Sequence, residues 1–302
     1  MPNLIEEFRR QAVTRLFTNT VNNCWPTWRD EIQRQLGENL DVNQVLNLGD
    51  HLGEIFRQTG TAGREQSQLS GGGTGWESLV GWYMNFCLLG SRTVVVKYTK
   101  TLIPQAITNA TAVMYGTFAS NSESDLVAIV FPDTPAFTDD LENEILTNTT
   151  LFKEYLDRET DNALDQIDVG IIQCKTNWND NSQVPMLWDM VYRAQQFRDQ
   201  NISVGRQGYG INDLHDFSYS FVTVPTSRGP FRPNSTQVNR VRNLSGGNYW
   251  GRPTETNVAN SIQEIFQRNF SNGQNNGLRV DLRNQLQNLR TEYDYFRLYN
   301  SD

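Results

Sequence analysis

Hydrophobic positions in the first part of the chain recur at the spacing of an α-helix. In residues 3–22 they are Leu4, Ile5, Phe8, Val13, Leu16 and Phe17. Residues 41–57 show the same periodicity, so we predict an N-terminal helical region. The glycine-rich stretch 69–75 that follows is too flexible for a regular element, and it predicts a loop or hinge.

The middle of the chain alternates between helical and extended patterns. Residues 76–89 are apolar on most faces, as in a helix packed inside a domain. Runs of β-branched and apolar residues predict short strands, and they lie at 93–97, 111–118, 126–131 and 169–174. The acidic segment 137–161 and the segment opened by Pro185 are expected to be helical. This order predicts an α/β (α+β) fold with a mixed central sheet flanked by helices.

The last third of the chain combines one alternating segment with two helical ones. Residues 217–224 alternate like a half-exposed strand, and 255–270 and 277–298 show helical patterns. The sequence therefore divides into an N-terminal helical region (1–70), a core (71–205) and a C-terminal region (206–302). We expect the C-terminal region to form one compact unit with the core.

Composition limits the cellular setting of the chain. In 302 residues, 37% of them hydrophobic, no apolar run reaches the roughly 18 residues of a membrane span. The first ten residues, MPNLIEEFRR, carry acids and arginines where a signal peptide needs an apolar stretch. We therefore expect a cytoplasmic protein without a membrane partner.

Cysteine and histidine are too few and too scattered for a zinc site. Cys24, Cys87 and Cys174 are far apart and each has apolar or aromatic neighbours, as buried free thiols do. His51 and His215 are the two histidines of the chain. A zinc hydrolase or a histidine-metal nuclease would need more ligands of these types.

The net charge of −8 disfavours a nucleic-acid partner only as an average over the chain. Between Asp216 and Glu255 there is no acidic residue, and the arginines of that stretch are Arg228, Arg232, Arg240, Arg242 and Arg252. One cationic segment on an otherwise acidic protein is typical of a surface that faces phosphates.

Two polar features interrupt the apolar strands. Asp125 stands at the start of one predicted strand, and Gln173-Cys174-Lys175 stands near the end of the next. Each feature alone has an ordinary structural explanation, because an aspartate can cap a turn and a lysine can solvate a strand end. Their combination calls for a chemical explanation.

The order of these residues resembles that of the PD-(D/E)xK nucleases. In that family an upstream helix carries a Glu, a strand begins with Asp, the adjacent strand ends in (D/E)xK, and a helix packs behind. This chain offers Glu77, Asp125, Gln173-x-Lys175 and the helix opened by Pro185 in the same order. The resemblance covers roughly residues 76–200 and implies a restriction-endonuclease-like core.

The chain departs from the family pattern at two positions. Ser124 replaces the proline before Asp125, and Gln173 replaces the second acid, as it does in a subset of these nucleases. Glu77 could restore the missing negative charge. Asp133, which follows Pro132, is an alternative to Asp125; we prefer Asp125 because it leads into the strand, whereas Asp133 lies beyond its end.

The resemblance implies a Mg²⁺-dependent hydrolysis of phosphodiesters. Asp125, the Gln173 side chain and the Cys174 carbonyl are expected to hold the metal, with Glu77 binding it directly or through water. Lys175 is expected to orient or help deprotonate the attacking water and to offset phosphate charge. The implied products carry 5′-phosphate and 3′-hydroxyl ends.

Candidate DNA-binding residues come from the cationic segment, because Arg reads guanine and Asn reads adenine in the major groove. They are Arg228, Arg232, Asn239, Arg240, Arg242, Asn243, Asn248 and Arg252. Some of these arginines are expected to touch phosphates only. Lys97 and Lys100 are weaker candidates for phosphate contacts.

A nuclease of this size with its own basic segment looks most like a type II restriction endonuclease acting on double-stranded DNA. From this class we expect a homodimer, because a palindromic site matches two-fold symmetry. A DNA methyltransferase would belong to the same system without forming a stable complex. The alternatives are a repair, junction-resolving or methylation-dependent nuclease with the same core, and a non-catalytic DNA-binding module.

Overall fold

The computed structural model describes most of the chain. The described residues are 2–38, 40–59, 72–98, 102–120, 125–176, 202–224, 239, 242–243, 245, 249–250 and 261–299. Statements about the structure below refer to these residues.

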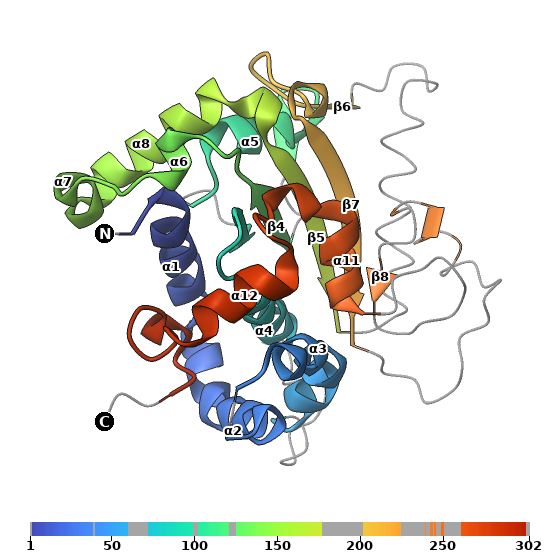
Figure 1. Cartoon of the computed structure of the whole chain (residues 1–302). Coiled ribbons are helices and arrows are strands. Elements are labelled where there is room, and N and C mark those ends of the chain that lie inside the picture. The colour runs from blue at the N-terminus through green and yellow to red at the C-terminus, as the bar shows by residue number, and fades with distance from the viewer. Residues whose placement is uncertain are drawn as a thin grey trace.

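A mixed sheet of five strands forms the centre of the described structure (Figure 1). Its strands, in spatial order, are β1 (Thr93–Lys97), β4 (Leu126–Val130), β5 (Asp168–Lys175), β7 (Asp216–Thr223) and β8 (Tyr249–Trp250). Strand β4 is antiparallel to both β1 and β5, whereas β7 is parallel to β5 and β8 is parallel to β7. The predicted α/β class with a mixed sheet flanked by helices is therefore confirmed.

Strands β4 and β5 are buried along almost their whole length because helices cover both faces of the sheet. Every residue of β4 is buried, and all of β5 except Lys175 is buried. Neighbouring residues on these strands point to opposite faces. Val127 and Ile171 thus join one hydrophobic cluster, and Leu126 and Ile172 join the other. A strand covered on both faces has apolar residues at nearly every position, and this explains why both strands could be predicted from the sequence.

Helices from both ends of the chain cover the two faces (Figure 1). The cluster containing Val127 is formed with α5 (Gln105–Ala110), α6 (Pro135–Thr138) and α8 (Thr149–Asn162), which follows α7 (Asn143–Thr147). The cluster containing Leu126 is formed with α2 (Asn19–Leu36), α3 (Val42–Arg57), α4 (Gly72–Cys87), α11 (Ile262–Asn269) and α12 (Leu278–Leu286). Helix α1 (Leu4–Leu16) contributes residues to both clusters.

Short elements complete the described fold. A second sheet contains β2 (Val113–Tyr115), β3 (Phe118–Ser120) and β6 (Ile202–Val204), with β2 in the middle. The short 3₁₀ turns are η2 (Leu164–Gln166), η5 (Ile211–Asp213), η6 (Ser271–Gly273) and η7 (Asp294–Phe296). In the described part of the chain, no helix is both long and apolar enough to cross a membrane.

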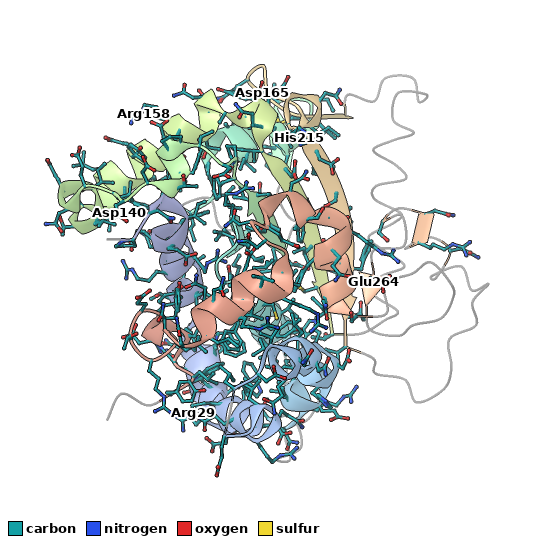
Figure 2. All side chains as sticks on the ribbon, in the orientation of Figure 1. Arg29, Asp140, Arg158, Asp165, His215 and Glu264 are labelled. Atoms are coloured by element: carbon teal, nitrogen blue, oxygen red, sulfur yellow. The ribbon has the colours of Figure 1, made fainter. Side chains whose placement is uncertain are left out.

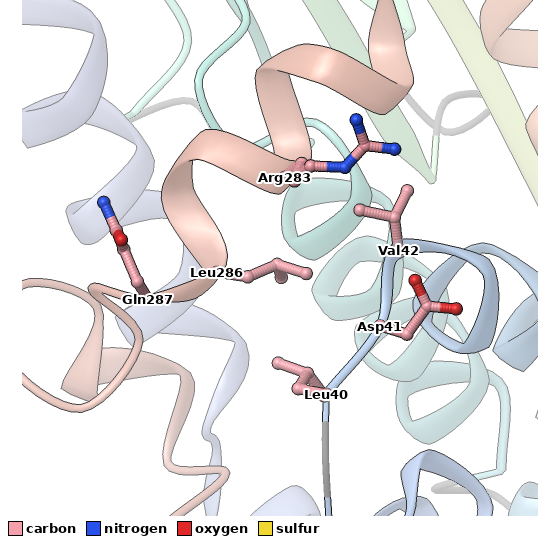
Figure 3. Close-up of a pocket in the computed structure, with 6 residues that line it drawn as sticks. All are labelled: Leu40, Asp41, Val42, Arg283, Leu286 and Gln287. Carbon is pink, nitrogen blue, oxygen red and sulfur yellow. The ribbon is translucent and has the colours of Figure 1, made fainter.

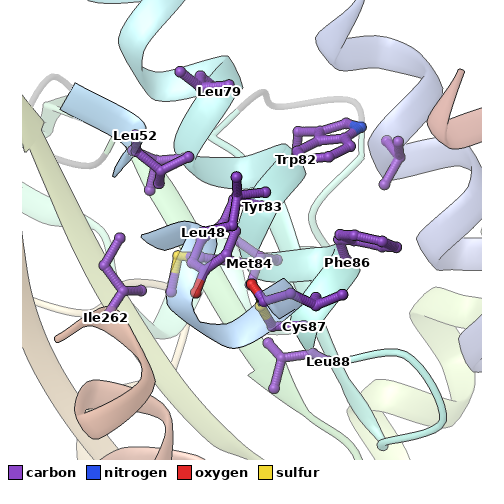
Figure 4. Close-up of a cluster of buried hydrophobic side chains, with 14 of the residues drawn as sticks. Leu48, Leu52, Leu79, Trp82, Tyr83, Met84, Phe86, Cys87, Leu88 and Ile262 are labelled. Carbon is purple, nitrogen blue, oxygen red and sulfur yellow. Dashed lines mark hydrogen bonds between the residues drawn. The ribbon is translucent and has the colours of Figure 1, made fainter. Parts of the chain in front are cut away.

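Helix α4 is deeply buried, and its Leu79, Trp82 and Phe86 side chains lie in the hydrophobic cluster of Figure 4. Two of its indole groups form hydrogen bonds with backbone carbonyls of other segments. The Trp76 Nε1–H group donates to the Val222 carbonyl of β7 at 3.1 Å. The Trp82 Nε1–H group donates to the Phe296 carbonyl at 2.9 Å. These contacts fix the position of α4, and of every side chain on it, relative to the sheet.

The start of α4 differs from the sequence prediction. The predicted loop at 69–75 overlaps the helix, which begins at Gly72. A Cβ atom on Gly75 would already touch the Trp28 ring at 3.4 Å, so a small residue lets α4 pack close to α2 and α3. Packing of a buried helix outweighs the low helix propensity of glycine here.

Other predicted elements are shorter or more divided than the patterns suggested. The predicted helix 3–22 breaks after Leu16, where the Thr18 side chain caps α2 by accepting a hydrogen bond from the Val21 N–H. The predicted strand 111–118 is a hairpin of β2 and β3 that turns at Gly116, with φ +60°. The predicted helix 277–298 ends at Leu286. The helix predicted from Pro185 lies outside the described residues.

The N-terminal and C-terminal helices share one hydrophobic cluster. This cluster extends from Val13 of α1 to Leu298 near the C-terminus, and it includes Val222 of β7. Strand β7, which we assigned to the C-terminal region, is thus an integral part of the central sheet. The proposed boundaries after residues 70 and 205 stay predictions.

Candidate active site

Two of the four predicted catalytic side chains, those of Asp125 and Lys175, meet where β4 begins and β5 ends. Asp125 directly precedes β4, and the antiparallel pairing of Leu126 with Ile172 brings it beside Gln173. The Asp125 Oδ2 atom accepts a hydrogen bond from the Cys174 N–H at 2.7 Å. The Lys175 Nζ atom lies 3.6 Å from the same oxygen. The register of one strand pair therefore brings together residues that are far apart in sequence.

Glu77, the fourth predicted residue, adds a second ion pair to this end of the sheet. It lies in the second turn of α4, and its Oε2 atom is 2.7 Å from Nζ of Lys97, the last residue of β1. The side chains of both pairs are 16–23% exposed, so the cluster is open to solvent on one side. We call Glu77, Lys97, Asp125 and Lys175 the charge quartet.

The two ion pairs of the quartet influence each other. Burial raises the pKa of Asp125 to about 6; the positive charge of Lys175 opposes this increase, and the negative charge of Glu77 adds to it. Glu77 is therefore close enough to Asp125 for electrostatic coupling. The formal charges of the two carboxylates and the two ammonium groups add up to zero. A bound cation or phosphate would therefore change the net charge of the whole cluster.

Cys174 contributes its backbone to the site and keeps its thiol protonated. Burial raises the pKa of the Cys174 thiol, and the charges of Asp125 and Glu77 raise it further. A protonated, buried thiol is a poor metal ligand. The expectation that Cys174 would offer its carbonyl oxygen is compatible with this environment and stays a prediction.

Gln173 is fully buried and only half of its amide is satisfied. Its Oε1 atom accepts a hydrogen bond from the Tyr219 hydroxyl at 3.0 Å, whereas its buried Nε2 atom has no hydrogen-bond partner among the described residues. Tyr219 was not among the residues predicted from the sequence. A buried amide group without a partner is unfavourable by about 1–3 kcal/mol, so its presence beside Asp125 needs an explanation.

The donor set of this cluster fits a hard divalent cation. Carboxylate, amide and carbonyl oxygens are the ligands that Mg²⁺ prefers, and Asp125, Glu77, Gln173 and Cys174 supply these types. Among the described residues, no group of three or more His, Cys, Asp or Glu side chains gathers at one point. The predicted metal site of two acids, an amide and a carbonyl stays a prediction. The unpartnered Nε2 group of Gln173 is a hydrogen-bond donor, so the amide would have to turn to offer its oxygen to a cation.

Asp133, the alternative acid, lies at the other end of β4. Val130, the last residue of that strand, pairs with Asp168 at the start of β5, and Asp133 follows as an exposed residue. The structure thus brings Asp125, and not Asp133, next to Lys175.

The predicted DNA-binding residues fall mainly outside the described part of the chain. Those outside it are Arg228, Arg232, Arg240, Asn248 and Arg252, together with Lys100. Of the others, the Arg242 Nη2 atom donates to Asn239 Oδ1 at 2.9 Å, and Asn243 is exposed. Their contact with DNA stays a prediction.

A second polar cluster lies at the opposite end of β5. The His215 Nδ1 atom is 2.6 Å from Oδ1 of buried Asp168, and Asn272 Nδ2 donates to Oδ2 of Asp168 at 3.0 Å. The bond with Asp168 raises the pKa of His215, and the nearby charges of Asp216 and Asp165 add to the increase. Figure 2 shows His215 and Asp165 at the same end of the molecule. These contacts satisfy a buried carboxylate and lie far along β5 from Lys175.

An open pocket between the start of α3 and α12 is separate from both clusters (Figure 3). Its lining residues are Leu40, Asp41, Val42, Arg283, Leu286 and Gln287. It contains none of the predicted catalytic residues, and we assign it no function.

Comparison of the chain with family models, curated proteins and solved structures gives no match. A function must therefore be inferred from the residues and their arrangement.

Proposed function

We propose that this protein is a Mg²⁺-dependent endonuclease of the PD-(D/E)xK type that cuts double-stranded DNA at a specific sequence, as a type II restriction endonuclease. The observation that carries the proposal is the convergence of Asp125 and Lys175 at the paired ends of β4 and β5, with Glu77 electrostatically coupled to Asp125. These three residues were selected from the order of motifs in the sequence.

The order of elements around the site supports the same proposal. Helix α4 carries Glu77, the antiparallel strands β1, β4 and β5 follow, and β7 adds a strand parallel to β5. This agrees with the helix, strand and strand order expected for the (D/E)xK core.

Each residue of the site has a role that follows from its chemistry. Asp125, Gln173, the Cys174 carbonyl and Glu77 would hold Mg²⁺, which supplies charge stabilisation for a phosphodiester under attack and acidifies a bound water. The Lys175 ammonium would orient the attacking water, help remove its proton and offset phosphate charge. In-line attack with the 3′-oxygen as leaving group gives 5′-phosphate ends.

Cleavage of unmodified plasmid DNA tests the proposal directly. Wild-type protein should give discrete fragments with Mg²⁺ and none with a chelator. Lys175→Ala should lose about 100-fold or more of the cleavage rate and keep DNA binding, because the ammonium acts on the reacting groups.

Lys153→Ala is the matched control, because Lys153 pairs with Asp157 within α8 at 2.8 Å and belongs to no predicted site. It should cleave like the wild type. Equal cleavage by Lys175→Ala and the wild type would exclude the proposed chemistry.

The alternative functions give different results in the same assay. A repair, junction-resolving or methylation-dependent nuclease would cut only branched or modified DNA. A non-catalytic DNA-binding module would retain DNA without hydrolysis and would be unaffected by Lys175→Ala; the amide at Gln173 in place of an acid is the feature that favours this alternative.

The homodimer is part of the proposal and follows from the expected palindromic site. Light scattering of the protein with and without a short duplex containing the cleavage site should give the mass of two chains per duplex.

A further inference from the structure

The side-chain amide of Gln173 and the hydroxyl of Tyr219 are joined by a hydrogen bond. Strand β5 lies between β4 and β7 in the sheet, so Gln173 has Asp125 on its β4 side and Phe221 as its partner on β7. Tyr219 pairs with Ile171 in the parallel register, and its side chain reaches along the same face to the Gln173 amide. Tyr219 is itself 7% exposed, so this contact is shielded from water.

An amide differs from a carboxylate in that its two ends are chemically unlike. In the acid that most of the family has here, both oxygens can bind a cation, and the orientation of the group is unimportant. In Gln173 only the oxygen end can bind a cation. In the structure that oxygen accepts a hydrogen bond from the Tyr219 hydroxyl, while Nε2 has no partner in the described part of the chain. A half-turn of the amide keeps the bond, because a tyrosine hydroxyl also accepts a hydrogen bond, and it turns Oε1 away from Tyr219.

We propose that Tyr219 is a positioning residue that orients the Gln173 amide by accepting a hydrogen bond from Nε2, so that Oε1 serves as a ligand for the divalent cation beside Asp125. This inference rests on the proposed function and explains how a neutral amide can replace the second acid. The Tyr219 hydroxyl gives the Nε2–H group of Gln173 a hydrogen-bond acceptor, and it thereby leaves the Oε1 atom available to bind the cation.

The test is a double-mutant cycle in which the Mg²⁺ affinity of each variant is measured. Calorimetry gives this affinity directly, and the Mg²⁺ concentration at which half of the increase in melting temperature is reached gives it independently. Tyr219→Phe should weaken Mg²⁺ binding about 3- to 10-fold, which is the effect of one lost hydrogen bond. Cleavage by this variant should recover at higher Mg²⁺ concentration.

Gln173→Glu supplies the matched background, because a carboxylate presents an oxygen whichever way it turns. Adding Tyr219→Phe to Gln173→Glu should change the Mg²⁺ affinity less than about twofold. Gln173→Ala is a second background, to be used if the Gln173→Glu protein does not fold. Adding Tyr219→Phe to Gln173→Ala should leave the Mg²⁺ affinity unchanged, because no amide remains to be oriented.

The outcomes separate this inference from the proposed function. An equal loss of Mg²⁺ affinity from Tyr219→Phe in all backgrounds, or no loss in the wild-type background, overturns the role of Tyr219 while leaving the nuclease intact. Wild-type protein that neither binds Mg²⁺ nor cuts DNA overturns both proposals.

Discussion

The Nζ atom of Lys97 lies 2.7 Å from the Oε2 atom of Glu77, at the end of the sheet where Asp125 and Lys175 also meet. The sequence indicated Lys97 only as a weaker candidate for a phosphate contact. Its position gives it a different task in the cation-free protein, because it offsets the charge of Glu77. A divalent cation that uses Glu77 must compete with this ammonium group.

Replacing Lys97 should therefore strengthen cation binding. Lys97→Met should bind Mg²⁺ about fivefold more tightly or better, because a positive charge next to the ligands is removed. Glu77→Gln should bind it more weakly. Because both side chains are partly exposed, the lost ion pair should reduce the free energy of unfolding by no more than about 1 kcal/mol. Calorimetric titration measures both variants, and weaker binding by Lys97→Met would contradict the competition.

Asp125→Asn should abolish cleavage without destabilising the protein. Burial raises the pKa of Asp125 to about 6, so the charged carboxylate at neutral pH opposes folding in the absence of a cation. The amide removes that charge and keeps an oxygen for the Cys174 N–H group. Chemical unfolding without Mg²⁺ at pH 8 should show equal stability or a gain of up to about 2 kcal/mol.

Mg²⁺ should raise the melting temperature of the wild type and not that of Asp125→Asn, because ligand binding stabilises only a protein with its ligating groups intact. A large loss of cation-free stability in this variant would show that Asp125 is chiefly a structural residue.

The bond between His215 and Asp168 should make stability depend on pH. Because the pKa of His215 is raised in the folded protein, its stabilising contribution is fully present below the unfolded pKa of about 6.5. It is lost as the pH rises through the higher folded value. Urea unfolding of the wild type and of His215→Gln should differ most at pH 5.5 to 6 and progressively less toward pH 9. A difference that grows with pH would refute this assignment.

Gly170, in the middle of β5, is expected to tolerate no side chain. A Cβ atom there would lie 2.6 Å from Cε1 of Phe270 and 2.9 Å from Oγ of Ser218. Gly170→Ala should lower the free energy of unfolding by about 1–3 kcal/mol, because the packed ring must move. The control is Gly73→Ala in α4, where the nearest atom would be 3.8 Å away and a small gain of stability is expected. Equal effects of the two substitutions in urea unfolding would contradict this reading of the packing.

The sequence predicted the central strands well and the helices less well, for a physical reason. Strands β4 and β5 are buried on both faces, so their apolar runs stand out from any context. Most of helix α2 was not predicted, because Pro26 and several asparagines interrupt its stripe of apolar residues. That stripe contains Val21, Trp25, Trp28, Ile32 and Leu36. The glycines at the start of α4 led to the wrong prediction of a loop, because packing against residues distant in sequence decides their conformation.

The site shows a similar division. The order of Glu77, Asp125, Gln173 and Lys175 was readable because each stands at the edge of a recognisable element. The contacts of Lys97 with Glu77 and of Tyr219 with Gln173 were not readable, because they depend on how α4 docks and on the register between β5 and β7. An alternating strand containing a tyrosine gives no sign of which neighbour its hydroxyl will meet.

The charge quartet comes from α4, from β1 and β5, and from the residue before β4, and this has a consequence for the cell that makes the protein. A nascent polypeptide that has not yet emerged as far as β5 lacks Lys175, and one whose β4 and β5 are unpaired keeps Asp125 and Lys175 apart. On the proposed function, an unfinished or misassembled chain is harmless to the genome, and the capacity to damage DNA arises only with the mature fold.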